Sequence, residues 1–109
     1  MNSWTKQQKV AIFRRCFRGR EDVYGTYDPA TGRSYQVKSP VTDRVILDHL
    51  RGRRPYGVYL LCRSRTQALA VDFDDGEIAG PAAFLRAARD CGLDPCLERS
   101  KSKGYHVWL

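Results

Sequence analysis

Two aspartates stand where an apolar segment ends, in the run Asp72-Phe73-Asp74-Asp75-Gly76. Successive side chains of a strand point to opposite faces, so we expect Asp72 and Asp74 on one face and Phe73 on the other. Neighbouring carboxylates repel one another unless a cation lies between them, and oxygen ligands suit Mg²⁺ or Mn²⁺. The spacing therefore predicts a divalent-metal site, and an ordinary Asp-Asp-Gly turn is the alternative.

A short segment near the end of the chain is rich in lysine and serine and precedes a histidine. Phosphate groups bind to lysine side chains, to hydroxyl groups and to the N–H groups of a glycine turn. An imidazole can bind a phosphate oxygen as well. We expect this segment on a hairpin that lies near the aspartates on one sheet. A surface turn with a half-buried histidine is the alternative. The candidate nucleotide-binding residues are Ser100, Lys101, Ser102, Lys103, Gly104 and His106.

The positive charge of the chain lies in its first half. The net charge is +7, fourteen of the 19 basic residues are arginine, and residues 1–55 hold 12 basic against 5 acidic side chains. Guanidinium groups suit bidentate contact with phosphate, so a polyanion such as nucleic acid is the expected partner. A solvated basic face that keeps the protein soluble is the alternative. The candidate nucleic-acid-binding residues are Arg14, Arg15, Arg18, Arg20, Arg51, Arg53 and Arg54.

The elements of the first half follow from capping and turn residues. Thr5 and Gln8 have the spacing of a capping box, which predicts a helix over about 5–18. Strand-forming segments at 22–27 and 34–38 flank turn residues and predict a hairpin. Thr42 is the expected cap of a short second helix, which Gly52 ends. These elements would carry the basic residues.

The second half predicts a compact unit of strands and one helix. We expect 56–62 and 67–73 to form an antiparallel hairpin of two central strands, joined by 63–66. A helix from Pro81 to Gly92 would then cross over to a strand at 95–99. A last strand, 105–109, would pair with that strand. Because this apolar strand ends with the chain, we expect the fold to continue in a longer parent protein.

Length and composition limit the class of protein. A chain of 109 residues with 42% hydrophobic and 28% charged residues makes one globular domain, in which we distinguish a basic region, 1–55, from a sheet region, 56–109. The sequence contains no apolar segment long enough to span a membrane and no signal segment. We therefore expect a cytoplasmic protein without a membrane partner. The spacing of the four cysteines matches no zinc motif, so we expect reduced, buried or half-buried thiols and no zinc.

At these residues the sequence resembles the archaeo-eukaryotic primase-polymerase superfamily, especially the primase domains of conflict systems and mobile elements that are fused to helicases. The resemblance lies in 13–24, 45–59, 68–75 and 97–109. It implies an α+β fold with an RRM-like sheet, antiparallel or mixed, and flanking helices. It further implies a nucleotidyltransferase that makes or extends primers on a single-stranded DNA or RNA template, using nucleoside triphosphates, with a fused or associated helicase as a further partner.

By the same resemblance, Asp72 and Asp74 are catalytic residues that bind Mg²⁺ or Mn²⁺, and His106 contacts the triphosphate. The sequence departs from the family pattern in two places. Gly104 stands where relatives often have a serine, with Ser102 just upstream, and 34–40 holds none of the cysteines that many relatives carry there. The third acidic motif of the superfamily would lie beyond Leu109, which implies an incomplete active site in these 109 residues.

Two other functions fit the same residues. The first is a non-catalytic module that binds single-stranded nucleic acid through the basic half, with the aspartates in a structural role. The second is a metal-dependent nuclease, because carboxylate pairs also serve hydrolysis. A nuclease would shorten a labelled strand, whereas a polymerase would lengthen it.

Overall fold

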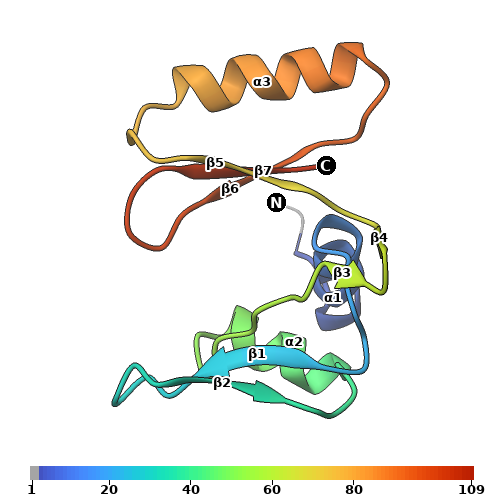
Figure 1. The fold of residues 1–109 in the computed structure, drawn as a ribbon, viewed down its shortest axis with the longest axis vertical. Helices are drawn as coiled ribbons and strands as arrows, with labels where there is room; N and C mark the ends of the chain where they lie inside the picture. Colours follow the sequence, from blue (N-terminus) through green and yellow to red (C-terminus); the bar gives the residue numbers. More distant parts are fainter. Residues whose placement is uncertain (1–2) are drawn as a thin grey trace. The chain divides into compact units, whose positions relative to one another are not determined.

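The structure is a computed structural model that describes residues 3–109. The described residues form an α+β fold of three helices and small antiparallel sheets, as expected for the fold class (Figure 1). Two compact units divide the chain, one ending at Gln67 and the other covering Ala68–Leu109. Within the described part of the chain, no helix is long and apolar enough to cross a membrane.

The two helices of the first unit begin at the predicted caps. Helix α1 (Lys6–Cys16) follows Thr5, whose side chain accepts a bond from the backbone of Gln8 while the Gln8 side chain bonds back to Thr5, which confirms the capping box. Helix α2 (Asp43–Leu50) follows Thr42, whose hydroxyl accepts from the N–H of Val45. Both helices therefore begin where a hydroxyl satisfies an otherwise unpaired N–H group.

The predicted hairpin of the first half is also present. Strands β1 (Tyr24–Tyr27) and β2 (Ser34–Val37) pair antiparallel, with Tyr24 opposite Val37. Gly32 closes the connecting loop with a φ of 73°, a conformation that favours glycine.

The core of the first unit joins its two helices. Val10, Val41 and Ile46 are buried, and the half-buried rings of Phe13 and Tyr56 pack against them. The two ring centroids lie 5.9 Å apart. Burial raises the pKa of the Tyr56 phenol above its ordinary value, because the phenolate would lose its hydration.

The segment between the two halves differs from the expected hairpin of two long central strands. Only Leu61–Cys62 (β3) and Arg65–Thr66 (β4) pair there, and all four residues are exposed. Residues 56–60 instead bind the first unit: Gly57 pairs with Gly25, and the Tyr59 carbonyl accepts from the N–H of Arg20. These contacts explain why residues 56–60 belong to the first unit, which ends at Gln67.

The second unit is a three-stranded sheet with one helix. Its sheet order is β5-β7-β6, and β7 pairs antiparallel with both neighbours. The outer strands are therefore parallel to one another and are joined through the helix, as the predicted crossover requires. The central position of β5 was not correctly predicted, because β5 is an edge of this sheet. The elements are β5 (Ala70–Phe73), α3 (Ala79–Asp90), β6 (Cys96–Arg99) and β7 (Tyr105–Trp108).

Helix α3 covers one face of this sheet (Figure 1). The rings of Phe73 and Phe84 meet edge to face at 5.9 Å, and Val107 and Ala88 are buried. The helix begins two residues before the expected Pro81, which is itself buried.

All four cysteines are free thiols, in line with the expectation for their redox state. The expected burial holds for the half-buried Cys16 and Cys96 and is wrong for the exposed Cys62 and Cys91. Cys62 lies in the exposed two-residue strand β3, which is shorter than the expected strand, and Cys91 follows the last residue of α3, so neither side chain is covered.

Candidate active site

Three polar side chains form a row across the sheet of the second unit. The register places Asp72 of β5 and Glu98 of β6 directly opposite His106 of the central strand β7. Residues directly opposite one another share a face of the sheet. Because Phe73, the neighbour of Asp72, contacts α3, the row lies on the other face.

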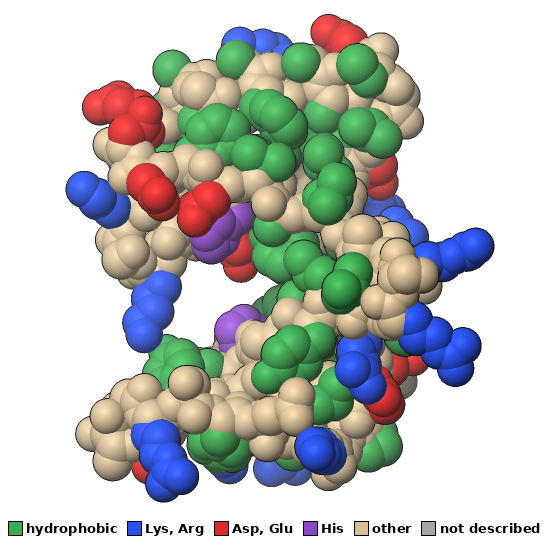
Figure 2. All heavy atoms as spheres, viewed as in Figure 1, with side chains coloured by type: hydrophobic (Ala, Val, Ile, Leu, Met, Phe, Trp, Pro, Cys, Tyr) green, Lys and Arg blue, Asp and Glu red, His purple; other side chains and the backbone are tan. Residues whose placement is uncertain are grey.

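The imidazole of His106 lies between the two carboxylates of this row. Its Nε2 atom is 3.3 Å from Oδ1 of Asp72, and its Nδ1 atom is 2.6 Å from Oε1 of Glu98. Figure 2 shows acidic side chains, in red, gathered on the surface of this unit. The His106 side chain is 30% exposed and that of Asp72 is 63% exposed, so a ligand can reach both groups.

Glu98 is the site residue that the sequence analysis missed. The hairpin β6–β7 pairs residues symmetrically about Ser102, so Glu98 and His106 must face one another. Placing the centre of the loop at Ser102 in the sequence would therefore have predicted this contact. The indole Nε1 of Trp108, two residues along β7, donates a second bond of 3.1 Å to the same carboxylate oxygen.

The second aspartate of the candidate metal site lies just outside the ladder. Strand β5 ends at Phe73, and Asp74 is exposed one residue beyond it. Asp75 makes the turn that follows, since its Oδ1 atom accepts from the N–H of Glu77 at 3.0 Å. The side chain of Asp75 therefore stabilises the turn. The carboxylates of Asp72 and Asp74 are exposed and accessible to a ligand.

These residues fit a divalent cation of the magnesium type by their chemistry. Asp72 and Asp74 offer carboxylate oxygens, and Mg²⁺ is commonly held by one or two carboxylates together with water and substrate phosphates. Between residues 3 and 109 no group of three or more His, Cys, Asp or Glu side chains is arranged as a closed metal site. An ion held by two carboxylates would keep coordination positions for water or a substrate phosphate.

The basic loop between β6 and β7 packs against the backbone of the acidic segment. The N–H of Ser100 donates to the carbonyl of Gly104 at 3.0 Å and closes the loop. Gly104 is buried, has a φ of 90°, and lies so close to Phe73 and Asp74 that a Cβ atom would collide with the Phe73 carbonyl. This contact explains the glycine where relatives often have serine.

The remaining loop residues lie beside that contact. Lys101, Ser102 and Lys103 are exposed, and Ser100 is half-buried. The loop that carries both lysines thus contacts the backbone at the end of β5 through Gly104. The structure therefore brings the predicted acidic and phosphate-binding residues together within one unit.

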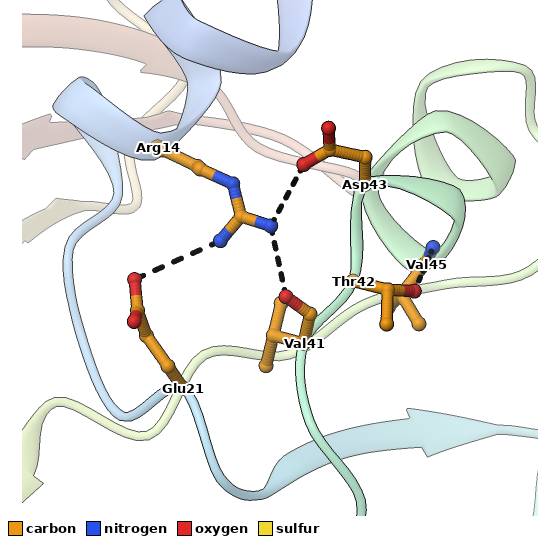
Figure 3. Close-up of polar contacts among 6 residues, drawn as sticks. All are labelled: Arg14, Glu21, Val41, Thr42, Asp43 and Val45. Atoms are coloured by element: carbon orange, nitrogen blue, oxygen red, sulfur yellow. Dashed lines mark hydrogen bonds and ion pairs between the residues drawn. The ribbon is translucent and has the colours of Figure 1, made fainter.

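Arg14 of the first unit is engaged in contacts that join its elements. Its Nη2 atom donates to the carbonyl of Val41 at 2.8 Å and to Oδ1 of Asp43 at 3.0 Å (Figure 3). Its Nη1 atom lies 3.7 Å from Oε1 of Glu21. The same close-up shows Thr42 capping α2 beside these contacts. Arg14 thus ties the end of α1 to the start of α2.

A cavity of about 390 Å³ at the end of α1 gathers four of the seven candidate arginines. Half-buried rings of Phe13, Phe17 and Tyr56 line it as well. The arginines that line it are Arg14, Arg15, Arg18 and Arg20.

Several candidate arginines have acidic, carbonyl or aromatic partners of their own. Arg20 donates two hydrogen bonds to Asp22, which raises the pKa of the guanidinium and lowers the pKa of the Asp22 carboxyl. Arg18 donates through Nε to the Arg15 carbonyl at 3.2 Å. The other three candidates, Arg51, Arg53 and Arg54, follow α2 and do not line the cavity.

Arg53 and Arg54 contact other parts of the first unit. The Nη1 atom of Arg53 lies 3.9 Å from Oδ1 of Asp48. Arg54 donates to the hydroxyl of Tyr35 and lies 5.7 Å from the centre of its ring. The structure therefore separates the seven arginines into a cavity group and a group after α2.

Fold and site together describe an α+β protein with a carboxylate–histidine row beside a basic loop. Residues 8–109 match the family model of the archaeo-eukaryotic primase domain of the TOTE conflict system. The match covers nearly the whole chain, so the chain belongs to this family, which confirms the resemblance seen in its motifs. Membership implies a primase-like nucleotidyltransferase. No curated protein shows significant similarity to the chain.

Proposed function

We propose that this domain makes or extends primers on a single-stranded template by transferring nucleotides from nucleoside triphosphates. The observation that carries the proposal is the register that sets Asp72 opposite His106 while Gly104 holds the lysine loop against Asp74. This arrangement supports a site in which carboxylates hold a metal beside cationic groups for a triphosphate. Family membership supports the same reaction class.

In this proposal Asp72 and Asp74 hold Mg²⁺ or Mn²⁺. When bound, such an ion neutralises phosphate charge and lowers the barrier to phosphoryl transfer. The two exposed carboxylates supply the negative charge that retains the ion beside the substrate. His106 and the lysine loop bind and orient the triphosphate, so that the protein contributes position and electrostatics to the reaction.

The sheet of the second unit supports an RRM-like arrangement. An RRM-like sheet begins with a strand, a helix and two further strands, in which the third strand lies between the first two. The order β5-β7-β6 with α3 on one face follows this pattern. We assign the sheet to this class within the proposal, with the acidic row on the face opposite α3.

Replacing Lys101 and Lys103 together by alanine is expected to weaken triphosphate binding by about tenfold or more. Each charge-assisted hydrogen bond contributes about 1.5 kcal/mol or more. Nucleoside affinity should change little, because the loop offers charge and no base-specific contact. Equilibrium titrations of the variant with a nucleoside triphosphate and with the matching nucleoside measure this difference.

The matched control replaces the exposed Lys6 and Lys9 of α1 by alanine, which removes the same charge elsewhere. Triphosphate affinity should stay within about twofold of the wild-type value. Equal losses for nucleoside and triphosphate in the Lys101 and Lys103 variant would show that the loop is a fold element and would exclude it as a phosphate site.

The arginine-lined cavity supports contact with the template backbone. Four to five phosphate contacts on a single strand predict a slope of about −3 when log affinity is plotted against log salt concentration. Replacing Arg15 and Arg18 by glutamine should flatten that slope by about 1.4, because each lost contact removes about 0.7. Arg14 is left intact in this variant because it ties α1 to α2.

Arg86 and Arg89 of α3 provide the control, since both are exposed in the second unit. Their replacement by glutamine should leave the slope unchanged. A wild-type slope near zero would show that the arginines form a solvated face, and template binding by the first unit would be rejected.

The same cavity favours a second candidate function, a non-catalytic module for single-stranded nucleic acid. It lies in a unit that contains neither Asp72 nor His106. Incubation of a labelled primer on its template with Mn²⁺ and nucleoside triphosphates separates the two. A lengthened strand supports the polymerase and a shortened strand supports a nuclease. An unchanged strand that is nevertheless bound supports the module when Mn²⁺ binding at Asp72 and Asp74 is absent as well, because the resemblance implies an incomplete active site in these 109 residues.

A further inference from the structure

We infer that Glu98 is a positioning residue that fixes the tautomer and the orientation of His106. The expected effect on triphosphate binding rests on the proposed function, in which His106 binds the triphosphate. The positioning of the ring is inferred from geometry alone. The carboxylate of Glu98 lies 2.6 Å from Nδ1 of His106, the shortest polar contact of the row.

The contact determines which ring nitrogen carries the proton in the neutral imidazole. A carboxylate only accepts hydrogen bonds, so Nδ1 must carry a hydrogen to bond with Glu98 at this distance. The proton state of one ring nitrogen is set by the bond that the other makes. The neutral ring carries one hydrogen, and the shorter contact with Glu98 holds it on Nδ1, so Nε2 is the nitrogen turned toward Asp72, 3.3 Å away. Nε2 donates to a phosphate oxygen when the ring is protonated, because both nitrogens then carry a hydrogen.

Trp108 keeps the Glu98 carboxylate in place. Its indole Nε1, which can only donate, bonds to the same Oε1 atom at 3.1 Å. One oxygen of Glu98 thus accepts from two side chains of the central strand. A flip of the His106 ring would replace Nδ1 by a carbon atom at 2.6 Å from that oxygen, so the bond also fixes the ring orientation.

His49, the other histidine of the chain, provides an internal reference with the opposite tautomer. Its Nδ1 atom accepts from the N–H of Tyr56 at 3.1 Å, which requires the proton on Nε2. Two-bond ¹H–¹⁵N correlation spectra, recorded at a pH where both rings are neutral, distinguish the two tautomers. The wild-type chain should show His49 with hydrogen on Nε2 and His106 with hydrogen on Nδ1, and a His49→Asn variant assigns the two signals.

Glu98→Ala is expected to shift His106 toward the Nε2–H tautomer. Glu98→Gln should keep the Nδ1–H tautomer, because its amide oxygen can accept from both His106 and Trp108. Affinity for a non-hydrolysable nucleoside triphosphate with Mn²⁺ should fall by about tenfold in Glu98→Ala, because the ring loses the charge-assisted bond that orients it, and stay within about threefold in Glu98→Gln.

A wild-type His106 with hydrogen on Nε2, or a tautomer unchanged in Glu98→Ala, would overturn the inference. The wild-type spectrum alone decides the first point, even if Glu98→Ala fails to fold. If the wild-type chain binds no triphosphate, the proposed function fails, whereas the spectra still decide whether Glu98 positions His106. The two failures are therefore distinguishable.

Discussion

Replacing Asp72 or Asp74 by asparagine is expected to weaken Mn²⁺ binding by about tenfold or more. Asparagine has the same shape but offers a neutral oxygen, so the remaining carboxylate retains the ion poorly. Both side chains are exposed, so the fold should stay intact. Titration with Mn²⁺, followed by the electron paramagnetic resonance signal of the free ion, measures the affinity.

Asp75→Asn is the matched control for both variants. Asp75 belongs to the same acidic run, and its asparagine equivalent can still accept the bond from Glu77 that closes the turn. Mn²⁺ affinity in this variant should stay close to that of the wild-type chain. If Mn²⁺ affinity is unchanged in both Asp72→Asn and Asp74→Asn, the acidic run is an ordinary turn at a strand end and the metal site is rejected.

Gly104→Ala is expected to destabilise the second unit by about 3 kcal/mol. A left-handed backbone costs a non-glycine residue about 1 kcal/mol, and overpacking adds roughly 1–3 kcal/mol. The added methyl group would collide with the Phe73 carbonyl and lie 3.1 Å from Cα of Asp74. Urea unfolding, followed by Trp108 fluorescence in a Trp4→Phe background, measures the free energy of unfolding.

Gly76→Ala separates backbone strain from collision. Gly76 also has a positive φ, 78°, but no atom lies within 4 Å of its Cβ position. This control should cost only about 1 kcal/mol. Equal losses in the two variants would show that the loop does not rest on the acidic segment, and the link between the lysines and Asp74 would be lost.

The parts of the fold that depend on local chemistry could be predicted from the sequence. Thr5 and Thr42 cap their helices with their own hydroxyl groups, and a hairpin needs only turn residues between two strand-forming segments. Part of the candidate site could also be predicted from local chemistry. The alternation of a strand and the tight loop before His106 were sufficient to bring Asp72 and His106 to one sheet.

The parts that depend on distant contacts could not be predicted. Residues 56–60 have the composition of a strand, yet the close approach of Gly25 to Gly57 draws them to the first unit. The edge position of β5 depends on its pairing with β7, which lies far along the chain. Glu98 was missed because an acidic residue on a strand carries no signal until the hairpin register is known.

The most direct test of the proposed site is a crystal structure of the chain with Mn²⁺ and a non-hydrolysable nucleoside triphosphate. We predict an anomalous manganese peak coordinated by Asp72 and Asp74, with the phosphates against the loop of Lys101 and Lys103 and within hydrogen-bond distance of His106 Nε2. Phosphates bound only in the arginine-lined cavity, with no manganese at the two aspartates, would contradict the proposed function.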